Sequence, residues 1–323
     1  MSLSKEELEQ HCKFILSDSR VRNKIIILCE GDVYKENGKL SPLYYKKMEN
    51  FPDANFYSAC VPKPWSNLRP CFFNCGDRND VLDTYFTLRE MIKEDTNNQY
   101  NYLEYNHPKK IFALVDLDIQ IKKINNYHFT DTQQIFSNLY QSGKINTLNS
   151  ELDHEIWTTG LIHKEAYFLI PVLQSLFDEQ INPPFYKNSQ LLLNNIYISM
   201  SHDISSDSDL KNSFEIACSR ICHCNGLNFS DADKLRDSWI NEFQNTTDEE
   251  RKHELVFSLL TIRKAKEYWH QIKPSDELDI DVSLYRNQLL LAIARNFYAK
   301  QTDDEAAAKY HIPYFFKMLR KFA

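Results

Sequence analysis

The sequence predicts an α/β fold, a mainly parallel sheet flanked by helices, followed by an α-helical domain. Two wholly apolar runs, Ile25–Cys29 and Ile111–Val115, are typical of strands buried on both faces of a parallel sheet. Helical patterns separate the predicted strands, and this alternation indicates crossover units. From about Asn182 onward the periodicity is almost entirely helical. We therefore expect an α/β domain with an N-terminal helix over residues 1–180 and a helical domain over residues 181–323.

The elements of the first half follow one another at short intervals. A capping box formed by Ser4 and Glu7 predicts a helix over residues 4–17. Further helices are predicted at Leu43–Met48, Asp80–Ile92 and Glu165–Phe177. Further strands are predicted at Asn55–Ala59, Cys71–Cys75 and Glu155–Thr158, and a polar loop at Asn97–His107.

The second half contains four more helical patterns without a repeat of fixed period, which favours a helical domain over a solenoid. They are Leu210–Cys222, Asp231–Phe243, Asp248–Trp269 and Leu278–Tyr298. A helix such as Leu278–Tyr298 supplies either core or a dimer interface, so a homodimer is one expectation.

The composition is that of a soluble globular protein, with 42% hydrophobic and 26% charged residues in a chain of 323. No apolar run reaches the roughly 18 residues of a membrane span, so we expect no membrane contact. The N-terminus is polar and lacks the apolar core of a signal peptide. Eight cysteines are too sparse for a disulfide scaffold. Together these features predict a cytoplasmic protein.

The six glycines form neither a nucleotide phosphate loop nor a dinucleotide-binding turn. The motifs of α/β-hydrolases and zinc proteases are also absent from the sequence. The net charge of −7 counts against nucleic-acid binding through the whole surface, which requires a basic excess. A nucleic-acid substrate would need a local basic patch or a contact bridged by metal.

Acidic residues follow both apolar runs directly. Glu30 follows the first run, and Asp116 and Asp118 follow the second. If the two strands are parallel neighbours, these carboxylates emerge at the edge where open sheets bind ligands. In an extended chain the side chains of Asp116 and Asp118 would point to one face, with their Cα atoms about 6.5 Å apart. Three such carboxylates repel one another unless a cation lies among them, and Mg²⁺ prefers such oxygen ligands. The alternative is that acids follow strands simply because loops are polar.

These residues resemble the TOPRIM family, in which one apolar strand ends in Glu-Gly and a later one ends in Asp-x-Asp. Here the two motifs are Ile25–Gly31 and Ile111–Asp118. Between them, Cys75–Leu82 is similar to the glycine turn and helix start of TOPRIM-like proteins related to OLD (overcoming lysogenization defect) nucleases. Thr158–Tyr167 looks like a later segment of that group, in which Glu165 is the matching acid. The resemblance covers roughly residues 24–180.

The resemblance implies metal-dependent phosphodiester cleavage of DNA or RNA with Mg²⁺ or Mn²⁺, as in a nuclease effector of anti-phage defence. It assigns Glu30 as general base or bridging ligand and Asp116 and Asp118 as ligands. Where the family places an acid four residues after the Glu, this chain has Tyr34, so either Asp32 takes the place of that acid or the turn is longer. That departure, with the acidic net charge, favours an alternative, a catalytically silent TOPRIM-fold binding or regulatory module.

OLD-type proteins join TOPRIM to an ATPase, so the missing phosphate loop implies a separate ATPase partner. Lys164 is a candidate to offset charge on the reacting phosphorus, although a solvated lysine is the more common interpretation. Arg78 is a candidate phosphate ligand at a helix start, or else a turn residue. The cluster Cys218, Cys222, His223 and Cys224 fits structural zinc less well than ordinary core packing, because no second pair lies nearby in sequence.

Overall fold

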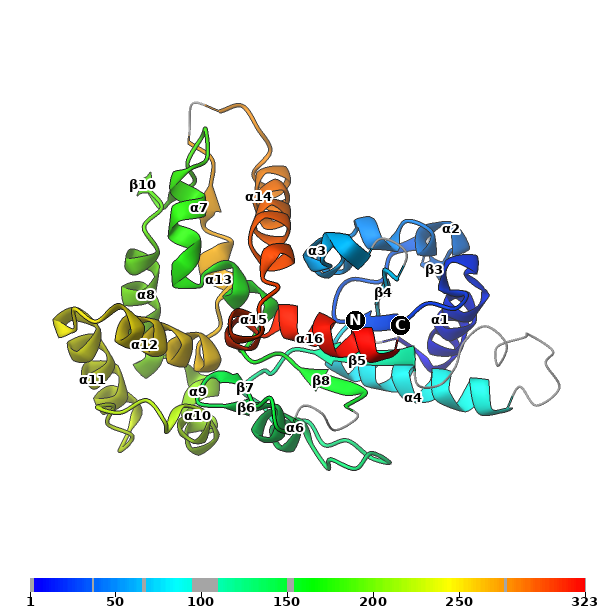
Figure 1. The fold of residues 1–323 in the computed structure, drawn as a ribbon, viewed down its shortest axis with the longest axis horizontal. Helices are drawn as coiled ribbons and strands as arrows, with labels where there is room; N and C mark the ends of the chain where they lie inside the picture. Colours follow the sequence, from blue (N-terminus) through cyan, green and yellow to red (C-terminus); the bar gives the residue numbers. More distant parts are fainter. Residues whose placement is uncertain are drawn as a thin grey trace. The chain divides into compact units, whose positions relative to one another are not determined.

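The computed structural model in Figure 1 describes residues 3–36, 38–65, 68–94, 110–149, 154–275 and 278–322. The chain packs into two compact units, and both are discontinuous in sequence. The first unit is Met1–Val115, Thr147–Thr158 and Ala294–Ala323, and the second is Asp116–Asn146 and Thr159–Ile293. This division differs from the single boundary near residue 180 that we expected.

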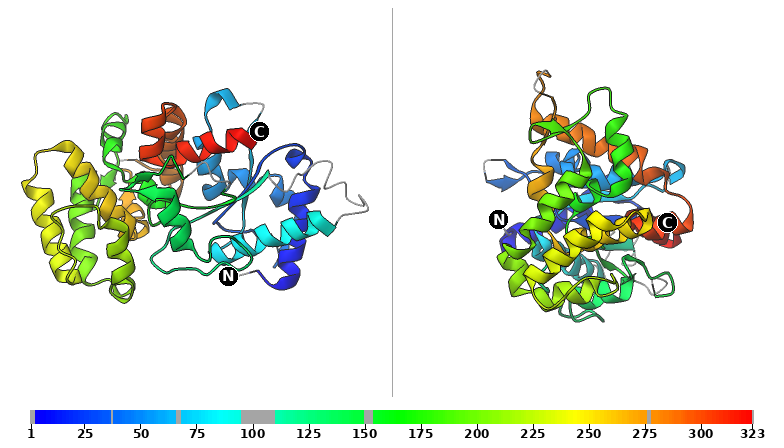
Figure 2. Two further views of the ribbon diagram at one scale, coloured as in Figure 1. Left: turned by 60° about the horizontal axis from the view of Figure 1, so that its bottom comes forward. Right: turned by 90° about the vertical axis from the view of Figure 1, so that its left-hand side faces the viewer.

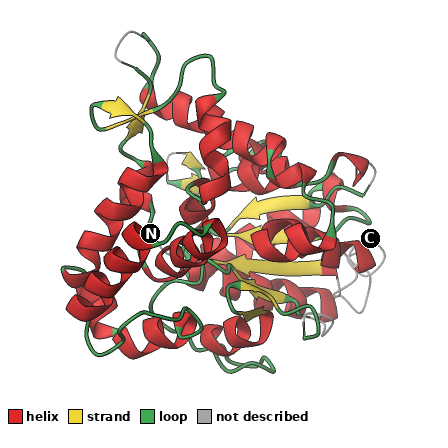
Figure 3. Cartoon of the chain, turned by 60° about the vertical axis from the view of Figure 1, so that its left-hand side comes forward, coloured by secondary structure: helices red, strands yellow, loops and turns green. Residues whose placement is uncertain are grey.

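The first unit is built on a four-stranded, all-parallel sheet, which confirms the predicted α/β class. The strands are β1 (Ile26–Cys29), β4 (Cys71–Asn74), β5 (Ile111–Val115) and β8 (Ile156–Thr158), in the order β4-β1-β5-β8. Their arrows point the same way in Figure 3. Every residue of the four strands is buried. That burial on both faces explains why the sequence runs are continuously apolar rather than alternating.

Helices cover both faces of this sheet (Figure 2). On one face lie α1 (Lys5–Ser17) and α4 (Arg78–Glu94), which pack on each other and, through α4, on β5. On the other face α16 (Ile312–Leu319) meets the sheet through two edge-to-face ring pairs, Phe316 with Phe72 and Phe315 with Trp157. Because burying one such ring contributes roughly 1.5–3 kcal/mol, the C-terminal helix is a substantial part of the core.

The remaining elements of the first unit are short, apart from α3. They are η1 (Ser19–Val21), β2 (Lys35–Glu36), β3 (Lys39–Leu40), α2 (Pro42–Tyr45), η2 (Met48–Asn50), α3 (Pro52–Cys60), η3 (Lys63–Trp65), η8 (Tyr298–Lys300), α15 (Asp304–Tyr310) and η9 (Arg320–Phe322). The strand predicted at Asn55–Ala59 is wrong, because these residues lie in α3. Pro52 occupies the first turn of that helix, where its fixed φ and missing N–H are tolerated.

The second unit is mainly helical, and its largest assembly is formed by α8 (Leu193–His202), α10 (Phe214–Ile221), α11 (Ala232–Asn245) and α12 (Glu249–Ile262). At its centre the buried ring of Trp239 stacks on Phe243. The indole N–H donates to the carbonyl of Leu255, at 2.9 Å. That bond satisfies the one polar group of an otherwise apolar side chain.

Shorter elements complete the second unit. They are α6 (Thr132–Leu139), β6 (Tyr140–Gln141), β7 (Lys144–Ile145), η5 (Lys164–Phe168), η6 (Pro171–Leu173), α7 (Gln174–Asp178), β9 (Phe185–Tyr186), β10 (Ser189–Gln190), η7 (Asp203–Ser205), α9 (Ser208–Asn212), α13 (Lys266–Trp269) and β11 (Ile272–Lys273). Helix α14 (Val282–Asn296) begins in this unit and ends in the first.

The continuous helix predicted at Glu165–Phe177 is wrong. The chain there forms η5, η6 and α7, and Ile170 has the extended angles φ −72° and ψ 146°. Pro171 explains the break, because a proline disfavours helical geometry in the residue before it. Among the described residues no helix is both long enough and apolar enough to cross a bilayer. The loop predicted at Asn97–His107 lies outside the described residues.

Candidate functional site

The carboxyl ends of β1 and β5 lie at one edge of the sheet in the first unit. Cys29, the last residue of β1, stands opposite Leu114 of β5 in a parallel register. Glu30, which is half-buried, therefore leaves the sheet at the edge where the chain passes from Val115 into Asp116. The prediction that these two apolar runs are parallel neighbours is confirmed.

Gly31 fixes the exit of β1. Its N–H and C=O pair with the C=O and N–H of Gly76, at 2.9 and 2.8 Å, so the ends of β1 and β4 are joined by a short antiparallel bridge. Gly31 has φ +149°, and a Cβ there would lie 2.6 Å from Oδ2 of Asp53 and 2.7 Å from Cγ of Asn74. Only glycine fits this position without displacing both neighbours, which gives the Glu-Gly motif a steric reason.

The other two sequence-predicted residues of the first unit are Asp32 and Arg78. Asp32 is exposed, and its carbonyl accepts from the side-chain amide of Asn74, at 3.3 Å. Arg78 is the first residue of α4. Asp77 already accepts from the backbone N–H groups of Asn79 and Asp80. A phosphate at this helix start would therefore depend on the guanidinium rather than on those amides.

Asp116 is the first residue of the second unit, and its side chain is 17% exposed. Its Oδ2 lies 3.4 Å from Nδ1 of His163. Burial raises the pKa of Asp116, the hydrogen bond and charge of His163 lower it, and the charges of Glu165 and Asp118 raise it further. The net effect is a pKa above the ordinary value of an aspartate.

Asp118 has a left-handed backbone, with φ +45°, so the expected extended Asp116–Asp118 geometry does not persist beyond β5. Its N–H donates to the carbonyl of Ile162 at 3.0 Å, and its Oδ1 accepts from the N–H of Ile119 at 2.7 Å. A non-glycine residue in this region is uncommon and costs on the order of 1 kcal/mol. Such strain persists where the surroundings fix it, often at functional sites.

Arg220 is the residue that fixes this turn, and sequence analysis missed it. It is buried on α10, and its Nη1 donates to the carbonyl of Asp118 at 2.6 Å. Its Nε donates to the side chain of Gln133 at 2.9 Å, and its guanidinium lies over the ring of Phe136. Its position 102 residues from Asp118 left no local signal in the sequence.

His163, Lys164 and Glu165 follow one another at the start of η5. Lys164 begins η5, and its Nζ lies 3.9 Å from Oε1 of the buried Glu165. Burial by itself would lower the pKa of His163, but the hydrogen bond and charge of Asp116, with the charges of Asp118 and Glu165, outweigh burial and raise it. The sequence analysis did not single out His163 as a partner of Asp116, although it stands directly before Lys164 in the segment that resembles the family.

Asp116 and His163 lie 3.4 Å apart, and around this pair four side chains of the second unit, the pair included, interact through their charges. They are Asp116, Asp118, His163 and Glu165. The cluster consists of three carboxylates and one imidazole. We refer to it as the acidic cluster.

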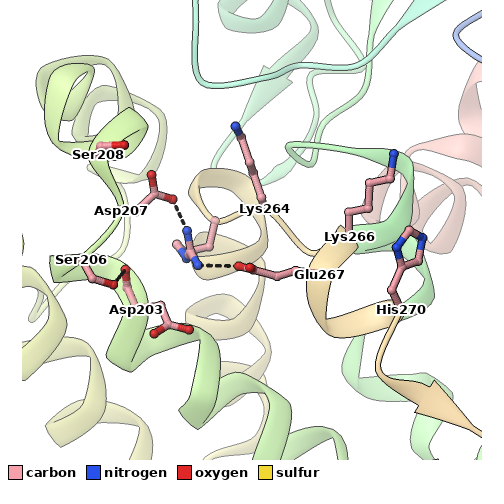
Figure 4. A pocket seen from close by; sticks show the side chains of 9 residues that line it. Asp203, Ser206, Asp207, Ser208, Lys264, Lys266, Glu267 and His270 are labelled. Atoms are coloured by element: carbon pink, nitrogen blue, oxygen red, sulfur yellow. Dashed lines mark hydrogen bonds and ion pairs between the residues drawn. The ribbon is translucent and has the colours of Figure 1, made fainter.

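A cavity of about 620 Å³ lies in the same unit, between the η7–α9 segment and the end of α12 with α13. Figure 4 shows Lys264 and Lys266 extending to the same side. Oε1 of Glu267 lies 2.9 Å from Nη2 of Arg263. The charge of Asp118 contributes to raising the pKa of Lys264, after the hydrogen bond to Asp209. The charges of Glu165 and Lys164 also act on His270 of this cavity. Lys264 of the cavity therefore lies within electrostatic range of Asp118.

The side chains of the acidic cluster are of the types that bind a divalent cation, but they are not arranged around one position. Mg²⁺ commonly binds through one or two carboxylates, with waters and substrate phosphates as its other ligands, and Asp116 and Asp118 supply two carboxylates. Within the described ranges, however, no group of three or more His, Cys, Asp or Glu side chains is arranged to hold a metal ion. This finding includes the zinc candidates Cys218, Cys222, His223 and Cys224.

Comparisons with known protein families, with curated proteins and with solved structures found no match to this chain.

Proposed function

We propose that the chain is a TOPRIM-like, metal-dependent phosphodiesterase that cleaves nucleic acid with Mg²⁺ or Mn²⁺. The single observation that carries the proposal is the half-buried carboxylate of Asp116, gathered with Asp118, Glu165 and His163 directly after a central parallel strand. Like charges close together in a partly dry site are costly. A cation bound at this edge, where parallel sheets bind ligands, would offset that cost.

A divalent ion held there would polarise a phosphoryl oxygen and lower the pKa of a bound water. The chain's own residues have three tasks. Asp116 and Asp118 are the proposed ligands, and Arg220 positions Asp118 through its backbone carbonyl. Lys164 offsets negative charge beside Glu165. Glu30 is the base or bridging ligand that the family resemblance implies, with Asp32 as its neighbouring acid.

A second candidate function is a catalytically silent TOPRIM-fold module that binds or regulates a partner. Two observations favour it. His163 already balances part of the charge of Asp116 without a metal, and among the described side chains no group of three ligands is preformed. A separate ATPase partner and a role in anti-phage defence remain predictions under either function.

The experiment that separates the two is a metal titration followed by a cleavage assay. We expect Mn²⁺ to bind to the wild-type chain, measured by calorimetry, and to support cleavage of labelled single- and double-stranded DNA and RNA. Asp116→Asn should abolish both metal binding and cleavage, and Glu30→Gln should abolish cleavage. Asp83→Asn, which removes an exposed acid on α4, is the matched control. A wild-type chain that binds neither Mn²⁺ nor Mg²⁺ would leave the silent module as the function.

A further inference from the structure

The first unit contains a cavity of its own, of about 330 Å³, and the charged residues that line it are all basic. Three cationic side chains line it, Lys63, Arg69 and Arg295, and no described lining residue is acidic. The chain as a whole carries a net charge of −7, so its average composition does not explain this basic lining. A cavity lined by one sign of charge concentrates ligands of the opposite sign.

The three cations come from separate segments that the fold brings together. Lys63 begins η3, Arg69 precedes β4, and Arg295 lies in the last turn of α14, whose C-terminal end belongs to the first unit. A basic residue at a helix C-terminus is favourable by itself. That general preference explains Arg295 alone but not its meeting with the other two around one cavity.

Arg69 is held in place, whereas the other two cations have unused bonding capacity. Nη2 of Arg69 donates to the carbonyl and the hydroxyl of Ser58, at 2.9 and 2.5 Å, which orients the guanidinium at the cavity. Neither Lys63 nor Arg295 forms an ion pair or a side-chain hydrogen bond with another described residue. Planar guanidinium groups and an ammonium group that converge in this way match the oxygens of a phosphate group.

The rest of the lining suits the neighbouring part of such a ligand. The side chain of Asn55 and the hydroxyl of Ser58 add neutral polar groups, while Ala59, Trp65 and Ala299 form an apolar wall. The volume is at the lower end of ordinary small-molecule pockets, about 300–1,000 Å³. It therefore suits a phosphate with one attached nucleoside rather than a large cofactor.

We propose that this cavity binds the phosphate of a nucleotide, supplied as a free mononucleotide or as one unit of a nucleic-acid chain. The proposal does not depend on the cleavage function, because it concerns a separate set of residues in the first unit. It also provides the local basic patch that nucleic-acid recognition by an acidic protein requires.

The test is calorimetric titration of the full chain in EDTA with three probes, AMP, inorganic phosphate and a short single-stranded oligonucleotide. We expect AMP to bind with a Kd on the order of 0.1 mM. Arg295→Gln and Lys63→Gln should each weaken binding about five- to tenfold, the loss of one charge-assisted contact. Gln preserves helix propensity in α14. Arg320→Gln, an exposed arginine of the same unit, should leave the affinity unchanged.

The probes identify the source of the phosphate. AMP binding tighter than inorganic phosphate indicates a free nucleotide, and equal affinities indicate recognition of the phosphate alone. Tighter binding of the oligonucleotide indicates a nucleic-acid chain. In that case the slope of log affinity against log salt concentration should fall by about two phosphate contacts in the double variant Lys63→Gln/Arg295→Gln. The proposal is overturned if no probe binds, or if Arg295→Gln and Lys63→Gln bind as tightly as the wild type. Since EDTA prevents metal-dependent cleavage, neither result reports on the proposed nuclease activity.

Discussion

Nδ1 of His163 lies 3.4 Å from Oδ2 of Asp116, so the half-buried carboxylate at the proposed metal site has an internal partner that is cationic when protonated. The two side chains are 19% and 17% exposed, which shields their interaction from solvent only in part. Each raises or lowers the pKa of the other in the direction that favours the ion pair. This pair stabilises the cluster when no metal is bound, and a metal ion would compete with it.

The two substitutions that each remove one partner of this pair should differ in their effect on stability in EDTA. His163→Asn removes this partner of the carboxylate and should lower the free energy of unfolding by about 1–2 kcal/mol. Asp116→Asn removes a costly charge and should leave stability unchanged or raise it by up to about 1 kcal/mol. Urea unfolding at pH 7.5 measures both, with Asp83→Asn as the exposed control. Equal losses in the two variants would contradict this account of the cluster.

Gly31→Ala should destabilise the first unit and disturb the exit of Glu30 from β1. An added methyl would collide with Asp53 and Asn74, and φ is +149°, so we expect a loss of about 2–4 kcal/mol. Gly38→Ala is the matched control, because φ there is also positive, +76°, but nothing lies within 4 Å of the added carbon. It should cost only about 1 kcal/mol. Similar losses in thermal unfolding would show that backbone strain, and not the collision, decides the first result.

Arg220→Gln should release the strained turn at Asp118. The substitution removes the donor to the Asp118 carbonyl and the contact with Phe136, so we expect a stability loss of about 1–3 kcal/mol. Because Arg220 positions a proposed ligand, the affinity for Mn²⁺ should fall at least tenfold in calorimetry. Arg236→Gln, which breaks ion pairs with the exposed Asp233 and Asp237, should change neither quantity measurably. Unchanged Mn²⁺ affinity in Arg220→Gln would remove its positioning role.

The central strands could be predicted because their physical cause is local. Each strand of the parallel sheet is buried on both faces, so Ile25–Cys29 and Ile111–Val115 had to be continuously apolar. The helix at residues 4–17 was equally readable, since Ser4 and Glu7 form both bonds of the capping box. Asn55–Ala59 could not be assigned, because five residues do not distinguish a buried strand from a buried helix turn.

Of the proposed site, only the residues that directly follow a strand could be predicted from the sequence. Asp116 and Asp118 were singled out because they come directly after an apolar run. The left-handed turn at Asp118 and its support by Arg220 depend on α10, about a hundred residues later. The return of residues 294–323 to the first unit was also invisible, because the ring pairs of Phe315 and Phe316 with the sheet carry no local pattern.

The buried His11 should make stability depend on pH. Its Nδ1 contacts the hydroxyl of Tyr45, its Nε2 lies 3.4 Å from Sγ of Cys75, and burial lowers its pKa from 6.5 to about 3. The unfolded chain therefore binds a proton below pH 6.5 that the folded chain does not bind until about pH 3. Stability from this group is complete above pH 6.5 and decreases as the pH falls, by up to about 1.4 kcal/mol per pH unit.

Urea unfolding of the wild type and of His11→Gln between pH 7 and pH 4.5 measures this term. His11→Gln is expected to be less stable at neutral pH, because it disturbs a buried contact, yet its stability should fall less steeply with decreasing pH. His202→Gln replaces an exposed histidine at the end of α8 and should keep the wild-type slope. The slope, unlike the absolute stability, reports only on proton uptake. An unchanged slope in His11→Gln would mean that His11 is protonated in the folded chain, and that its neutral pairing with Tyr45 and Cys75 is wrong.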